Sequence, residues 1–254
     1  MRKSSYSSPE IHVSGLKKKL PGVFFYYHMI SIILHSYKKA KRGKYSDKNW
    51  VDDSQSILNA LESVGVKFRW DNLSSFQNLQ SPCIFVCNHM STLETFVLPC
   101  ILGPHEKVTF VVKKSLTEYP VFKHIMNSRN PIVVGRVNPR DDFKMVLSEG
   151  KKRIDNGISL IIFPQTTRSN DLDPQKFNTM GVKLAKHAQV PVIPVALKTD
   201  AWGVGKIIKD FGKIDPGKSV RFSFGKPIYI KGNGKDEHKE TVMFIRSKLD
   251  EWRS

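Results

Sequence analysis

The sequence has little cysteine and lacks the short motifs of several enzyme classes. Its three cysteines, Cys83, Cys87 and Cys100, form no CxxC pair, and their number is odd. We therefore expect reduced thiols in a cytosolic setting, without a disulfide framework or a zinc site. The absence of a GxSxG turn disfavours a serine hydrolase. A nucleotide-binding enzyme is disfavoured because neither GxGxxG nor a phosphate-loop lysine motif is recognised. The sequence predicts neither a metal nor a cofactor.

Long hydrophobic runs are also lacking. The sequence has no stretch of about 18–20 apolar residues, the length that a helix needs to cross a bilayer. The first apolar run begins only at Val23, and no small-residue cleavage pattern follows it. A secretory signal is therefore not expected.

Acidic residues are scarce: 23 Asp and Glu stand against 41 Lys and Arg, which gives a formal net charge of +18. Such an excess attracts polyanions, meaning nucleic acid, an anionic membrane surface or phosphorylated substrates. The sequence contains no recognised nucleic-acid-binding motif, and its basic clusters flank an apolar segment instead. We therefore expect an anionic membrane surface or a phosphorylated substrate as partner, and no nucleic acid.

An apolar, aromatic-rich segment occupies residues 23–34. Three lysines at 17–19 precede it, and five basic residues follow it between residues 38 and 44. The segment is too short to span a bilayer but suits the membrane interface, with rings at headgroup depth and lysines on anionic lipid. The pattern leaves open a core helix or a partner-binding helix with solvated flanks.

Beyond residue 65 the chain alternates between short apolar strands and helices, which indicates a sheet that is covered on both faces. We predict an α/β fold with a mixed, largely parallel sheet covered by helices. Residues 1–65 would form a loose tail and an amphipathic helical membrane-associating segment, and residues 66–254 the α/β domain. The expected strands are 83–87, 108–112, 131–134, 159–163, 190–197 and 220–224, and the expected helices are 50–64, 95–102, 119–126, 142–156, 174–187 and 237–252.

The strand at 190–197 contains two prolines, Pro191 and Pro194. Proline cannot donate a hydrogen bond to a neighbouring strand. The two prolines therefore predict an edge or irregular position for this strand.

Residues 88–94 join a predicted strand to a predicted helix and contain a histidine and an acid. On a helix, at about 100° per residue, His89 and Glu94 would lie about 140° apart, so they can pair only if His89 lies in the turn before the helix. Ser91 and Thr92 favour a helix start there. One interpretation is a general base with an orienting acid. The other is a capping box, in which Glu94 bonds the backbone and His89 satisfies a buried carbonyl.

Two further loops carry an arginine. Arg136 follows the strand at 131–134, and Arg168 follows the strand at 159–163. Because loops after parallel strands gather at one edge of a sheet, where ligands bind, we expect both arginines to face the same cleft as His89. A guanidinium can hold a phosphate with two hydrogen bonds, so both are candidate phosphate ligands. A surface position without a ligand is the alternative for each arginine taken alone.

Four short blocks occur in order along the chain. They are Asn88-His89-x4-Glu94, Pro-Ile-Val-Val-Gly-Arg at 131–136, Phe-Pro-Gln-Thr-Thr-Arg-Ser at 163–169, and Val-Pro-Val-Ile-Pro-Val at 190–195. With these blocks the chain resembles the glycerolipid acyltransferases typified by 1-acyl-glycerol-3-phosphate acyltransferase. That family has Asn-His-x4-Asp, a strand ending in Arg, Phe-Pro-Glu-Gly-Thr-Arg-Ser and a Val-Pro-Val-Ile-Pro-like strand. The resemblance covers roughly residues 55 to 230, and the order of the four blocks makes it specific.

The resemblance implies acyl transfer from acyl-CoA or acyl-carrier protein to the hydroxyl of a lysophospholipid, with no metal and no cofactor. The implied acceptor is 1-acyl-sn-glycerol-3-phosphate, which would give phosphatidic acid. His89 would be the general base and Glu94 its orienting acid. Such an enzyme would work at the cytoplasmic face of a membrane, peripheral or monotopic, and at the inner membrane in a bacterium. The implied substrate-binding residues are Asn88, Arg136, Gln165, Thr166, Thr167 and Arg168.

The chain departs from the family pattern at two places. Glu94 replaces Asp and adds one methylene, a variant that resembles the related lipid A acyltransferases. Gln165-Thr166 replaces Glu-Gly, which removes a charge beside the expected acceptor and puts a β-branched residue where glycine allows close backbone approach. The alternatives are therefore another lysolipid acceptor, or a catalytically weak lipid-binding relative.

Overall fold

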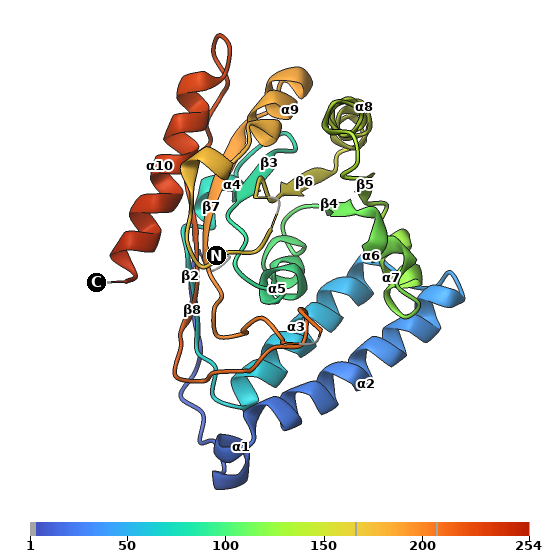
Figure 1. Ribbon diagram of the computed structural model, residues 1–254, viewed down its shortest axis with the longest axis vertical. Helices are drawn as coiled ribbons and strands as arrows, with labels where there is room; N and C mark the ends of the chain where they lie inside the picture. The colour runs from blue at the N-terminus through green and yellow to red at the C-terminus, as the bar shows by residue number, and fades with distance from the viewer. Residues whose placement is uncertain (1–3, 166, 207, 254) are drawn as a thin grey trace.

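The computed structural model describes residues 4–165, 167–206 and 208–253, which form a mixed eight-stranded sheet with helices on both sides (Figure 1). The strands are β1 (Tyr6–Ser7), β2 (Phe68–Asp71), β3 (Ile84–Cys87), β4 (Val108–Lys113), β5 (Ile132–Val134), β6 (Ser159–Ile162), β7 (Val192–Lys198) and β8 (Val220–Phe224). Their order is β1-β2-β8-β7-β3-β6-β4-β5. Among these strands, only β1–β2 and β7–β8 pair in antiparallel fashion, so the predicted mixed, largely parallel sheet is confirmed.

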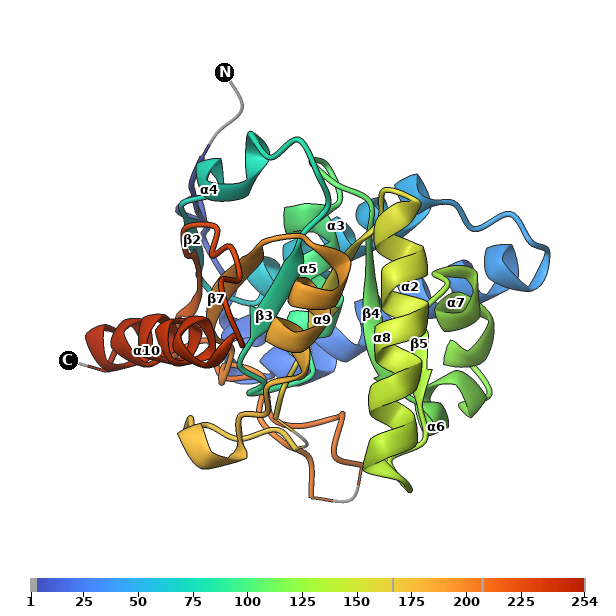
Figure 2. The ribbon, with the colours of Figure 1, turned by 90° about the horizontal axis from the view of Figure 1, so that it is seen from above.

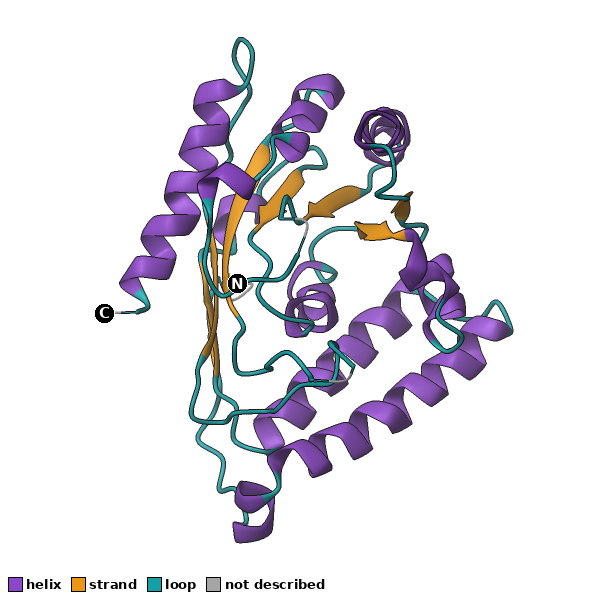
Figure 3. Cartoon of the chain, viewed as in Figure 1, coloured by secondary structure: helices purple, strands orange, loops and turns teal. Residues whose placement is uncertain are grey.

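Helices connect the strands and cover both faces of the sheet (Figure 3). The first five are α1 (Gly15–Lys19), α2 (Pro21–Lys41), α3 (Asp47–Ser63), α4 (Ser74–Gln77) and α5 (Leu93–Leu102). They are followed by α6 (Lys114–Glu118), α7 (Phe122–Ser128), α8 (Pro139–Asp155), the single 3-10 turn η1 (Pro174–Lys176), α9 (Met180–Ala188) and α10 (Lys235–Glu251).

Strand β3 separates two hydrophobic layers. Successive side chains of a strand point to opposite faces. Phe85 and Cys87 join the core cluster that includes α2, α3 and α5, whereas Ile84 and Val86 join the cluster that includes α8, α9 and α10. All four side chains are buried. A strand that is buried on both faces has a continuous apolar sequence, which is why the run at 83–87 predicted it.

Strand β7 lies inside the sheet, between β3 and β8, so its predicted edge position is wrong. The Pro194 carbonyl accepts the Gly225 N–H at 2.8 Å, and Gly225 is the first residue after β8. In an antiparallel pair, a residue's N–H and C=O point toward the same neighbour. The side of Pro194 that lacks an N–H therefore faces Gly225, just beyond the end of β8. No hydrogen bond between the two strands is lost there, so an interior strand tolerates the proline.

Two other predictions about elements need correction. Residues Tyr6–Ser7 do not belong to a loose tail, because they pair with β2, a strand that the sequence analysis did not predict. The helix expected at 174–187 is divided into η1 and α9. Asn178 lies between the two, and its side chain accepts the Met180 N–H at 2.9 Å. Helix α9 therefore begins separately at Met180 and does not continue η1.

Helix α2 has two apolar sides. Phe25, Met29 and Ile33 are buried in the same core cluster as one face of the sheet. A second apolar row is between 46% and 73% exposed and consists of Val23, Tyr27, Ile30 and Leu34. In the described part of the chain, no helix is both long enough and apolar enough to cross a membrane. The division of the chain at residue 65 stays a prediction.

The close packing of α9 on β3 generates a prediction about stability. A Cβ on Gly181 would lie 2.5 Å from Val86 Cγ2, in the core. Gly181→Ala should therefore lower the free energy of unfolding by about 1–3 kcal/mol, measured by urea denaturation. The matched control is Gly22→Ala in α2, where a Cβ would meet nothing nearer than 3.9 Å. Equal stabilities of the two variants would contradict this packing.

Candidate active site

The carboxyl ends of β3, β5, β6 and β7 lie at one edge of the sheet, because these four strands run in the same direction. In Figure 2 the loops after β6 and β7 (gold and orange) extend beyond this edge. The loop after β3 carries His89, the loop after β5 carries Arg136, and the loop after β6 carries Arg168. The residues after β7 form a fourth segment that the sequence analysis did not include.

His89 and Glu94 are in direct contact. The histidine lies in the turn between β3 and α5, and the acid lies in the first turn of α5. The distance from His89 Nδ1 to Glu94 Oε1 is 2.8 Å. Glu94 Oε1 also accepts the backbone N–H groups of Met90 at 2.7 Å and Ser91 at 3.0 Å. The histidine–acid contact of the first interpretation and the backbone bonds of the second are therefore both present, because one carboxylate bonds the imidazole and the backbone.

Glu94 is completely buried. The hydroxyls of Ser91 and Thr199 lie 3.0 and 2.6 Å from its Oε2. Burial by itself raises the pKa of this carboxyl. The hydrogen bond and charge of His89, together with the bonds from Thr199 and the backbone, lower the pKa of Glu94 below its ordinary value. The side chain is therefore a buried carboxylate that can orient an imidazole and stabilise its protonated form.

The turn that carries His89 is held by the loop after β6. The Gln165 Oε1 accepts the His89 N–H at 2.7 Å, and the Ser169 N–H donates to the His89 carbonyl at 2.9 Å. The imidazole stacks on the Phe163 ring, with 4.4 Å between the centroids. These contacts orient Nδ1 toward Glu94, which leaves Nε2 as the nitrogen that can take a proton from a substrate.

Two of the predicted substrate ligands have partners inside the protein. Asn88 is 2% exposed, and its side chain exchanges two hydrogen bonds of 2.8 Å with the backbone of Leu197. These bonds continue the pairing of β3 with β7 past the last residue of β3. Gln165 is 5% exposed and holds the His89 backbone. Both side chains support the turn, and contact of either one with a substrate stays a prediction.

Arg168 lies beside the same turn and is already paired. Its Nη2 is 2.6 Å from Asp210 Oδ1, and its Nη1 donates to the hydroxyl of Thr92, which precedes the first residue of α5. The Arg168 side chain is 21% exposed. Thr167, next to it, is exposed, and Thr166 lies outside the described residues. The structure therefore connects Arg168 to the His89–Glu94 turn through Thr92.

Arg136 lies farther along the edge, at the end of β5, which β4 and β6 separate from β3. It is exposed, and its backbone has a left-handed φ of 58°, which is uncommon for a residue with a long side chain. The Arg136 N–H donates to Asp142 Oδ2 at 2.7 Å, and the Gly135 N–H donates to Asp142 Oδ1 at 2.8 Å. The structure fixes the backbone of this loop but places Arg136 three strands away from His89.

Sequence reasoning missed two residues at this edge, Thr199 and Asp210. Strand β7 ends at Lys198, so the rule that selected the loops after β3, β5 and β6 also selects the residues after β7. Correct placement of the strand would have indicated Thr199 as a candidate.

Residues 212–219 read Gly-Lys-Ile-Asp-Pro-Gly-Lys-Ser. They match the Gly-x4-Gly-Lys-Ser pattern of nucleotide phosphate-binding loops, so the expectation that the chain contains no such lysine motif is wrong. That pattern requires a loop that joins a strand to a helix. Here the residues lead into strand β8, and Lys218 pairs with Asp200 at 3.0 Å. The match therefore lacks the architecture of a phosphate-binding loop.

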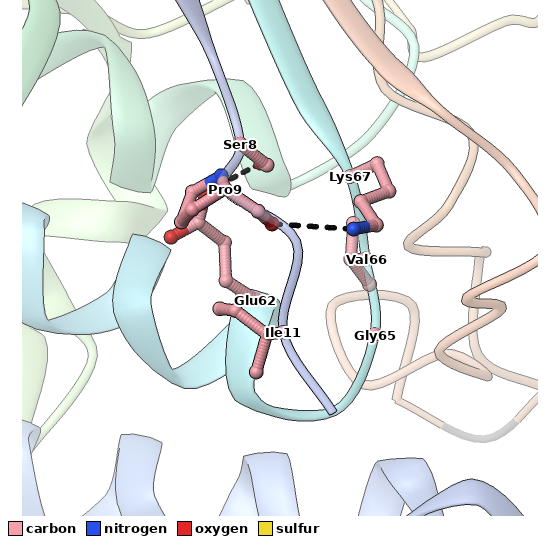
Figure 4. A pocket seen from close by; sticks show the side chains of 7 residues that line it. All are labelled: Ser8, Pro9, Ile11, Glu62, Gly65, Val66 and Lys67. Carbon is pink, nitrogen blue, oxygen red and sulfur yellow. Dashed lines mark hydrogen bonds between the residues drawn. The ribbon is translucent and has the colours of Figure 1, made fainter. Parts of the chain in front are cut away.

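A metal centre and a pocket are two other kinds of site that could carry a function. Within the ranges that the structure describes, no group of three or more His, Cys, Asp or Glu residues could hold a metal ion. A pocket lies at the amino-terminal end of β2 (Figure 4). None of the candidate site residues lines it. It is lined by Ser8, Pro9, Ile11, Glu62, Gly65, Val66 and Lys67.

Comparison with known proteins identifies the class to which this fold and site belong. A sequence profile described as acyltransferase matches residues 67–198, about half of the chain. The chain therefore belongs to the acyltransferase family, and the predicted resemblance to the glycerolipid acyltransferases is confirmed. The chain also superposes on the crystal structure of the 1-acyl-sn-glycerophosphate acyltransferase of Thermotoga maritima with a TM-score of 0.71. That comparison covers 94% of this chain and 97% of the other at 20% identity, and it establishes the shared fold.

Curated relatives give a consistent picture. The chain is 32% identical over 133 residues to a 1-acyl-sn-glycerol-3-phosphate acyltransferase of Pseudomonas aeruginosa, which covers 52% of this chain and 50% of that protein. It is 26% identical over 246 residues to a chloroplastic 1-acyl-sn-glycerol-3-phosphate acyltransferase of Arabidopsis thaliana, which covers 89% and 63%. The chain spans half or less of the length of the first curated relatives that it matches.

The buried carboxylate generates a prediction about pH. At neutral pH, Glu94→Gln should lower the free energy of unfolding by about 1–3 kcal/mol, because the new amide N–H₂ would face hydrogen-bond donors. The lowered pKa of Glu94 means that its contribution is present above the unfolded pKa of about 4.3 and is lost as the pH falls through the folded pKa. The difference between wild type and variant should therefore shrink below about pH 4.

Urea unfolding from neutral to acidic pH measures this difference. Glu118→Gln on the exposed surface of α6 is the control, and its stability should follow that of the wild type. A difference for Glu94→Gln that stays constant or grows in acid would show that the carboxylate is not held ionised by its donors.

Proposed function

We propose that the protein is an O-acyltransferase that moves a fatty acyl chain from an acyl thioester to the hydroxyl of a lysophospholipid. The acceptor would be 1-acyl-sn-glycerol-3-phosphate and the product phosphatidic acid. The observation that carries the proposal is the contact of His89 with the buried Glu94 at the carboxyl edge of the sheet, in a chain of the acyltransferase family. The names of the relatives in Pseudomonas and Arabidopsis support the choice of acceptor.

His89 would act as the general base. Its Nε2 takes the proton of the acceptor hydroxyl while the oxygen attacks the carbonyl carbon of the thioester. The C–S bond of the tetrahedral intermediate then breaks, and the imidazolium returns the proton to the departing thiolate. Glu94 holds Nδ1 and stabilises the positive charge that the ring carries between these two steps. The chain's own residues supply this chemistry without a cofactor.

Arg168 would hold the acceptor's phosphate near the base, because its guanidinium adjoins the His89–Glu94 turn through Thr92. Arg136 and Thr167 are exposed at the same edge and would contribute from farther out. Asn88 and Gln165 would act through the position of the His89 turn. Acyl-CoA and acyl-carrier protein are both anionic donors that suit a chain with a net charge of +18.

Membrane contact would be made by α2. Its exposed apolar row consists of Val23, Tyr27, Ile30 and Leu34, and basic residues flank this row on either side. An apolar row between basic residues suits the interface of an anionic membrane. We therefore place the protein at the cytoplasmic face of a membrane, peripheral or monotopic, and at the inner membrane in a bacterium. Both lipid substrates would then be within reach.

Acyl transfer is tested with purified protein, acyl-CoA or acyl-carrier protein as donor, and a panel of lysolipids. We expect the highest turnover with 1-acyl-sn-glycerol-3-phosphate. His89→Ala should reduce turnover by about 10²–10⁴-fold, because general-base assistance is lost. His187→Ala, on the exposed face of α9, should have no effect.

The outcomes separate the alternatives. Turnover with a different lysolipid would keep the reaction and change the acceptor. Product from no lysolipid, with lipid binding retained, would identify a catalytically silent lipid-binding relative and overturn the proposal. Normal turnover by His89→Ala would refute the assignment of the base.

The role of α2 is tested separately by flotation with vesicles of anionic phospholipid. Tyr27→Glu and Ile30→Glu place a charge in the exposed apolar row and should each weaken vesicle binding by roughly tenfold. The matched control is Tyr229→Glu, because Tyr229 is also exposed (60%) but lies between β8 and α10. Equal binding by all three variants would exclude α2 as the membrane contact.

A further inference from the structure

Arg168, the cation proposed to hold the acceptor's phosphate, is paired with an acid from the loop after β7. Its Nη2 lies 2.6 Å from Asp210 Oδ1. The Thr92 hydroxyl accepts a hydrogen bond from Arg168 and lies 3.2 Å from the same carboxylate oxygen. Segments that follow β3, β6 and β7 therefore meet at this contact. A carboxylate therefore already occupies the guanidinium that is proposed to hold the acceptor's phosphate.

The carboxylate of Asp210 is one of several groups that hold its loop in place. The Asp210 carbonyl accepts the indole N–H of Trp202 at 3.1 Å, and Trp202 is 1% exposed. The Gly203 N–H donates to the Lys213 carbonyl at 2.9 Å, which closes the base of the loop. The side chain of Asp210 itself is 41% exposed. Removal of its charge should therefore leave the loop anchored by its backbone and by the buried indole.

We infer that Asp210 is a specificity-determining residue, an internal anion that competes with the acceptor's phosphate for Arg168. The inference rests on the proposed function. A phosphate and a carboxylate on one guanidinium repel each other, so the phosphate must displace Asp210 to bind Arg168 fully. Among residues 203–213 Asp210 is the only acid, and Lys206, Lys209 and Lys213 accompany it. The released carboxylate therefore remains close to cations.

Competition of this kind acts selectively. It weakens the binding of every acceptor whose headgroup needs Arg168. A neutral lipid with the same acyl chain does not need the guanidinium and is unaffected. The strength of the preference for anionic acceptors is then set by Asp210 together with Arg168. Asp210 lies 42 residues after Arg168 in the sequence and outside the four family blocks.

Steady-state kinetics with the full chain test this inference. The KM for 1-acyl-sn-glycerol-3-phosphate and the inhibition constant of monoacylglycerol, its uncharged analogue, are measured for wild type and Asp210→Asn. We expect Asp210→Asn to lower the KM by about two- to tenfold and to leave the inhibition constant unchanged. Asp52→Asn removes a carboxylate that pairs with the exposed Lys48, and both constants should stay at the wild-type values. An unchanged or raised KM, or a parallel fall of both constants, would overturn the inference.

A second measurement uses the wild-type protein and needs binding alone. Hydrogen exchange of the backbone at 208–213 should become faster when saturating 1-acyl-sn-glycerol-3-phosphate displaces Asp210 from Arg168. Slower or unchanged exchange there would contradict the competition, even if Asp210→Asn failed to fold. Because this readout does not depend on turnover, it separates failure of the inference from failure of the proposed acyl transfer.

Discussion

The site depends on one buried charge. Glu94 has no exposed surface, and a carboxylate in such a position is stable only when hydrogen-bond donors surround it. Its donors come from residues 89–91, after β3, and from Thr199, after β7. Parallel pairing of β3 with β7 brings these two strand ends together. The contacts that stabilise the carboxylate therefore also fix the imidazole beside it, and the sheet order is part of the chemistry.

The local sequence pattern was sufficient to predict those features whose residues are neighbours both in the sequence and in space. The apolar run at 83–87 predicted β3, because a strand that is buried on both faces has no polar positions. The five-residue spacing of His89 and Glu94 required a turn before a helix, and such a turn joins β3 to α5. The exposed apolar row on α2 also follows from local sequence. An apolar segment has apolar side chains all around its helix, and only one face of the helix can be buried against the core.

Contacts between distant segments could not be predicted in this way. Thr199 is 105 residues from Glu94, and no local pattern marks it as a partner. The prolines of β7 predicted an edge strand, and only the register shows that Pro194 faces the end of β8. Arg168 was correctly expected on the carboxyl edge, yet its pairing with Asp210 depends on how the loop after β7 folds against it. Strand order and loop conformation are set by packing across the whole chain.

The proposed mechanism requires that Glu94 fixes the His89 ring with Nε2 free to take the proton of an acceptor hydroxyl. Nitrogen-15 NMR of the labelled imidazole, at a pH of about 8 where histidine is ordinarily neutral, measures the tautomer directly. We predict a proton on Nδ1 and none on Nε2 in the wild type, with this preference lost in Glu94→Gln. A proton on Nε2 in the wild type, or the same tautomer in both proteins, would contradict it.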